Sequence, residues 1–79
     1  MVGTIKKEDA KMNTREIINK LPENVRNKVE RMKAQYKICD NFHKRSEIRE
    51  RIAGYVDGLR DSGFITERER QVVYVYATL

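Results

Sequence analysis

The chain has 79 residues, of which 39% are apolar and 37% are charged, with 17 basic and 12 acidic side chains. This length allows one small domain, whose core rarely contributes more than roughly 3–5 kcal/mol without a disulfide, a metal or a second copy of the chain. A single cysteine excludes an internal disulfide, and one cysteine with one histidine cannot complete a four-ligand metal site. We therefore expect self-association, as a homodimer, or a partner to supply the additional stability.

The sequence contains no apolar run of the ~18–20 residues that cross a membrane, and its N-terminus lacks the apolar stretch of a signal peptide. We therefore expect a soluble cytoplasmic protein without membrane contact, whose lone thiol stays reduced. The net charge of +5 lies entirely in residues 1–47, which hold 12 basic and 7 acidic side chains. A basic half of this kind favours an acidic protein surface or a polyanion as the partner.

Residues 1–13 show no sustained hydrophobic period, and we expect them to form a flexible leader. Thr14 is a suitable N-cap for a short helix over residues 15–21, which Pro22 ends. Pro22 is also expected to open a second helix over about residues 22–40, because its missing N–H suits the first helical position. The short helix should lie across this second helix, since two turns are not stable alone.

The position of the apolar stripe changes between the second helix and a third. The stripe members are Val25, Val29, Met32, Tyr36 and Cys39 in the second helix and Ile48, Ile52, Tyr55 and Leu59 in the third. In one unbroken helix the second stripe would lie roughly 150° around from the first. We therefore expect a break over residues 40–46, with Ser46 as the N-cap of a helix over about 46–62. One long, gently bent helix is the alternative.

The third helix ends in a stop signal, DSGF. Gly63 is expected to adopt the left-handed conformation after the C-cap, and Phe64 to fold back on Leu59. Inside this helix Gly54 and Gly58 each cost roughly 1 kcal/mol relative to alanine, which suggests that another backbone passes close by.

The last segment is expected to form a fourth helix, over about residues 66–77. Thr66 and Glu69 fit a capping box at its start. The sequence VVYVY over residues 72–76 is rich in strand formers, so a strand is the alternative. However, the last 16 residues contain no Gly, Asn, Asp or Pro, and a hairpin there would lack turn residues.

These elements predict an all-α fold over residues 14–79, a compact bundle of three to four helices with a C-terminal helical hairpin. The third and fourth helices should form an antiparallel pair, with the second helix packed across them.

A row of cations on one flank of the second helix is a candidate partner-binding site. Arg26, Lys33 and Lys37 share this flank, and Lys44 joins them if the helix continues. Such a row suits an acidic protein surface or phosphates. Glu30 lies in the same row and can pair with two of the cations, so a solvated helix surface is the alternative interpretation.

The C-terminal cluster is a candidate interface with a second copy or a partner. Val73, Tyr74 and Tyr76 carry large side chains, and tyrosine is favoured at interfaces because its ring is buried while its hydroxyl stays hydrated. The alternative is ordinary core packing against the second and third helices.

We expect neither an enzyme nor a cofactor. Cys39 and His43 are four residues apart, as half of a metal site would be, but nothing else in the sequence supports a metal. The chain has no glycine-rich phosphate loop, and a Cys39 nucleophile would need a positioned third group.

Two resemblances bear on function. Ile52, Val56, Leu59 and Gly63 resemble the end of the recognition helix and the first wing strand of winged-helix repressors, with VVYVY as the second wing strand. Residues 52–79, with an amphipathic helix, the turn DSGFIT and a short aromatic helix, resemble small all-α proteins of bacterial phages and mobile elements.

The second resemblance implies a non-enzymatic protein-binding module that regulates or inhibits a larger host protein or nucleoprotein. The alternative is a small basic DNA- or RNA-binding regulator, of winged-helix or helical type. It would contact phosphates through the cations Arg26, Lys33, Lys37, Lys44 and Arg45.

Overall fold

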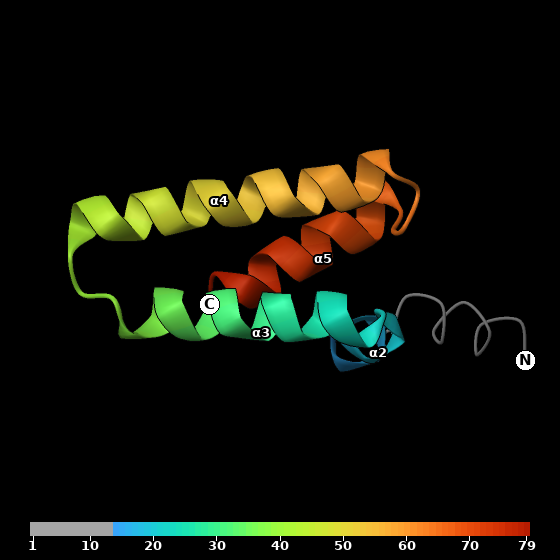
Figure 1. Ribbon diagram of the computed structural model, residues 1–79, viewed down its shortest axis with the longest axis horizontal. Helices are drawn as coiled ribbons and strands as arrows, with labels where there is room; N and C mark the ends of the chain where they lie inside the picture. Colours follow the sequence, from blue (N-terminus) through green and yellow to red (C-terminus); the bar gives the residue numbers. More distant parts are fainter. Residues whose placement is uncertain (1–13) are drawn as a thin grey trace, which may run out of the picture.

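The computed structural model describes residues 14–79, which form four α-helices and no strand. These are α2 (Thr14–Lys20), α3 (Glu23–Ile38), α4 (Phe42–Asp61) and α5 (Glu67–Ala77). α3 and α4 form a long hairpin, and α5 crosses the space between them (Figure 1). The all-α prediction is confirmed, and the winged-helix interpretation, which needs strands in the last segment, is wrong. The predicted leader lies outside the described residues.

The core is built where α5 contacts α2, α3 and α4. Its buried apolar side chains are Ile17, Ile18, Leu21, Val25, Val29, Met32, Tyr36, Ile52, Val56, Leu59, Ile65, Val73 and Ala77. Both core residues of α5 are fully buried. α2 packs chiefly against α5, not across the next helix in the chain as expected, because the buried face of α5 comes to lie beside it.

α3 buries the predicted stripe only as far as Tyr36, which is 8% exposed. The helix ends at Ile38, and Cys39 follows with extended backbone, so this residue does not continue the stripe inside the helix. At the other end, Pro22 precedes the first turn with ψ at 150°, and its carbonyl accepts the N–H of Arg26 at 2.8 Å. The prediction that Pro22 occupies the first helical position is therefore wrong by one residue.

The predicted break between the second and third helices is confirmed, but it lies earlier and is shorter. It consists of Cys39, Asp40 and Asn41. The backbone N–H of Lys44 donates to Asn41 Oδ1 at 3.0 Å, so Asn41 caps α4. Ser46, predicted to be the cap, lies inside α4.

The stop signal after α4 forms as predicted, but the apolar contact differs. Gly63 has φ at 84°, its N–H donates to the carbonyl of Arg60 at 3.0 Å, and the N–H of Phe64 donates to the carbonyl of Leu59 at 3.0 Å. This is the Schellman arrangement. Phe64 is nevertheless 63% exposed, and Ile65, at 6%, enters the core in its place.

α5 begins with the predicted capping box between Thr66 and Glu69. Glu67, beside the cap, accepts hydrogen bonds from Arg60 of α4 at 2.7 Å and from Arg70 at 2.8 Å. The bond from Arg70, followed by that from Arg60, lowers the pKa of Glu67 to about 2. This network joins the ends of α4 and α5 on the outside of the core.

Gly54 and Gly58 face open space, because a Cβ at either position would meet no atom within 4 Å. The predicted close backbone approach is therefore wrong. We expect Gly54→Ala and Gly58→Ala each to raise the free energy of unfolding by about 1 kcal/mol, measured by urea denaturation. Gly63→Ala is the control and should destabilise, since its φ of 84° disfavours a side chain. A loss of stability in Gly54→Ala would contradict the open surface.

Acid should weaken the fold through Glu67. Because the carboxyl has a pKa near 2 when folded and an ordinary value of 4.5, its stabilising contribution is present above about pH 4.5 and disappears as the pH falls toward 2. We expect the urea midpoint to fall across this range. In Glu67→Gln the fall should be smaller, and an equal fall in the variant would show that other carboxyls carry the acid sensitivity.

Candidate functional site

The predicted basic flank is divided between two environments. Arg26 donates to the backbone carbonyl of Asn19 at 3.4 Å, and Lys33 donates from Nζ to the carbonyl of Tyr76 at 2.9 Å. Lys37 and Lys44 are exposed and lie on either side of the loop between α3 and α4. The structure therefore uses the first two cations to hold its own elements and leaves the other two on the surface.

Tyr76 joins α5 to α3 through contacts with two residues of α3. Its hydroxyl donates to Glu30 Oε2 at 2.7 Å, and Lys33 Nζ lies 4.4 Å from the centre of its ring. The hydrogen bond to Glu30, followed by burial, raises the pKa of Tyr76. Glu30 and Lys33, predicted to pair with each other along α3, thus meet instead at a tyrosine of α5.

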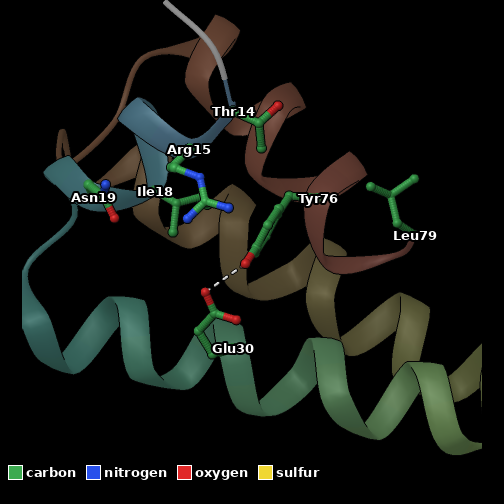
Figure 2. Close-up of a pocket in the computed structure, with 7 residues that line it drawn as sticks. All are labelled: Thr14, Arg15, Ile18, Asn19, Glu30, Tyr76 and Leu79. Atoms are coloured by element: carbon green, nitrogen blue, oxygen red, sulfur yellow. Dashed lines mark hydrogen bonds between the residues drawn. The ribbon is translucent and has the colours of Figure 1, made fainter.

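A cleft of about 290 Å³ lies beside this contact. Figure 2 shows the guanidinium of Arg15 extending from α2 toward the hydroxyl of Tyr76, with Glu30 below it. Ile18 and Leu79 supply the apolar part of the lining. The hydrogen bond between Tyr76 and Glu30 crosses the cleft and joins α5 to α3. These two polar groups of the lining therefore help to hold the helices together.

The predicted C-terminal interface contains one residue that is inaccessible. Val73 is fully buried in the core, whereas Tyr74 and Tyr76 are half-buried. The apolar side chains of this end that do face solvent are Val75, 54% exposed, and Leu79, 69% exposed. The accessible apolar surface at this end is therefore formed by Val75 and Leu79, and not by the predicted Val73.

The loop end of the α3–α4 hairpin carries a second exposed apolar surface. Figure 1 shows this end projecting beyond the C-terminal end of α5. Ile38 is 81% exposed and Phe42 is 75% exposed, one at each end of the loop. Lys37 directly precedes Ile38, and Lys44 lies two residues after Phe42. We call these four residues the hairpin-end surface.

Two contacts lie beside the hairpin-end surface. The guanidinium of Arg45 lies 4.7 Å from the centre of the Tyr36 ring, which joins the first turn of α4 to the last turns of α3. Asn41 caps α4 at the same place. Cation–π contacts and caps each contribute on the order of 1 kcal/mol. Ile38 and Phe42 thus lie next to residues that join α3 to α4 and cap α4.

Cys39 and His43 do not share a helix face. Cys39 lies in the loop, where its thiol contacts the carbonyl of Asn41 at 3.6 Å, and His43 lies in the first turn of α4. The predicted break over residues 40–46 would have placed His43 in a loop, and this is wrong because Asn41 caps the helix before it. Within residues 14–79 no group of three His, Cys, Asp or Glu side chains is placed to hold a metal.

Ile38 and Phe42 were not singled out by the sequence, although one signal was present. Ile38 is two residues after Tyr36 and so falls roughly 160° away from the buried stripe of α3. Phe42 directly follows Asp40 and Asn41, two turn formers that indicate the break between the helices. Large apolar residues off the stripe and beside a loop were the available indication of a surface site.

Comparison of the chain with protein-family models, curated proteins and solved structures finds no match. The chain is described by its fold and its surface: it is a small helical bundle with an exposed hairpin end. No helix formed by the part of the chain that the structure describes is long and apolar enough to cross a membrane.

Proposed function

We propose that this chain is a small non-enzymatic protein-binding module of the cytoplasm, a regulator or inhibitor of a larger protein or nucleoprotein, of the kind that phages and mobile elements encode. The observation that carries the proposal is the exposure of Ile38 and Phe42 at one projecting end of the molecule. Large apolar side chains that gather on a surface mark interaction sites, and aromatic residues are frequent anchors there.

The partner should present an apolar pocket with an acidic rim. Phe42 is suited to enter the pocket, while Lys37 and Lys44 are suited to carboxylates at its edge, where complementary charge speeds association and selects the partner. The contact between Arg45 and Tyr36 supports affinity, because a surface that is already ordered loses less entropy on binding.

The nucleic-acid alternative loses part of its support. A row of phosphates would need the whole basic flank, yet Arg26 and Lys33 donate to carbonyl groups of the chain itself. A mobility-shift titration with DNA and RNA at two salt concentrations tests this alternative. Tight binding that falls steeply with salt would favour it over the protein partner.

The double variant Ile38→Gln/Phe42→Gln tests the protein-binding proposal. Truncating an anchor residue costs about 2 kcal/mol or more, so a protein captured from the native host should bind the variant at least about thirtyfold more weakly. Surface plasmon resonance with the captured protein measures this loss. The fold should be unaffected, since both side chains are mostly exposed.

Phe64→Gln is the matched control, because Phe64 is 63% exposed at the opposite end of α4. Lys37→Glu/Lys44→Glu should also weaken binding, whereas Arg68→Glu, at an exposed position of α5, should not. Equal binding of the double variant and Phe64→Gln would contradict the proposal.

The proposal includes a homodimer formed through the outer side of α5. Val72 and Val75 lie three residues apart in α5, Leu79 follows just after the helix, and the last two are more than half exposed. Light scattering should give the mass of a dimer, falling to that of a monomer in Val75→Glu. A monomer at high concentration would remove self-association from the proposal.

A further inference from the structure

A hollow of about 150 Å³ lies between α3 and α4 and is lined mainly by cationic side chains. Its lining residues are Lys28, Arg31, Met32, Gln35 and Arg51. The first four come from α3 and the last from α4, so the hollow forms only when the hairpin closes. It lies apart from the flank of Lys33, whose amine turns to α5.

The three cations of this hollow have no carboxylate partner among the residues that the structure describes. Within residues 14–79, neither Lys28 nor Arg31 nor Arg51 forms an ion pair, whereas Arg60 and Arg70 both pair with Glu67. Lys28 Nζ contacts the Tyr55 ring instead, 5.3 Å from its centre. Three like charges that line one hollow without a counter-charge repel one another, and a bound anion relieves that repulsion.

The donors in the hollow favour a compact anion with several oxygens. Arg31 and Arg51 each present a planar fork of N–H groups, Lys28 an ammonium and Gln35 an amide NH₂. A tetrahedral phosphate offers more oxygens to such donors than a carboxylate, which has only two. Met32, 4% exposed, closes one side of the hollow with apolar surface.

We propose that this hollow binds one phosphate group in its doubly charged form, either as the free ion or as a monoester. The volume corresponds to about five water molecules, which accommodates a phosphoryl group and leaves the rest of the ligand outside. The group can come from free phosphate or from a phosphorylated serine, which share this chemistry. The site does not depend on the hairpin-end surface, whose residues do not line it.

The experiment is an NMR titration of the full chain at constant ionic strength. The probes are inorganic phosphate, O-phosphoserine, acetate and a single-stranded oligonucleotide. We expect saturable shifts of the side-chain N–H signals of Arg31, Gln35 and Arg51 with both phosphate probes, and at least about tenfold weaker binding of acetate. If inorganic phosphate and O-phosphoserine bind with equal affinity, the phosphoryl group alone is recognised. If O-phosphoserine binds more tightly, a phosphorylated side chain is the source of the group.

Arg51→Gln should weaken phosphate binding by about tenfold or more, because it removes one charged donor pair. Arg68→Gln is the matched control, with the same change in net charge on α5. An equal loss of phosphate affinity in the two variants would show that only the net charge matters, and it would contradict the proposed site. Tighter binding of the oligonucleotide than of phosphoserine would also overturn it in favour of a polynucleotide surface.

Thermal unfolding in phosphate-free buffer provides a second readout. If Arg51 serves a ligand and not the fold, Arg51→Gln should keep or raise the unfolding midpoint, since it removes repulsion with the neighbouring cations. A lower midpoint would show that the guanidinium supports the fold and would contradict the assignment.

Discussion

The packing of α5 into the space between α3 and α4 is the contact on which the rest of the structure depends. Val73 and Ala77 are fully buried there, and α2 has its principal helix contact with the same element. Without α5, the buried faces of the other three helices would be open to water. The core of this short chain is therefore centred on its last 11-residue helix.

The length of α5 also decides which surfaces remain free. At 1.5 Å per residue, its 11 residues cannot cover a hairpin whose arms have 16 and 20 residues. The loop end with Ile38 and Phe42 is therefore left projecting (Figure 1). The flank that faces α5 is used internally through Lys33, while the opposite side of the hairpin keeps Arg31 and Arg51 exposed around a hollow.

Local signals in the sequence predicted the features that depend on neighbouring residues. The stripe of α3 as far as Tyr36, the capping box at Thr66 and the left-handed Gly63 form as expected, since each is fixed within a few turns. The start of α4 was missed because Asn41 and Ser46 are both good caps, and the sequence offers no means of ranking them.

The site was harder to predict because it depends on where α5 lies. Along α3 alone, Arg26 and Lys33 look as accessible as Lys28 and Arg31. The amine of Lys33 finds its hydrogen-bond acceptor, the backbone carbonyl of Tyr76, only when α5 packs beside α3. Helical periodicity ranks the faces of one helix, but it does not identify which flank a distant segment will cover.

Native-state hydrogen exchange tests most directly whether α5 holds the bundle together. If it does, the amides of residues 73–77 will exchange with the same free energy of opening as those of residues 52–56 in α4, and both will match the free energy of global unfolding. A distinctly smaller opening free energy for residues 73–77 would contradict this account, because the α3–α4 hairpin would then persist without α5.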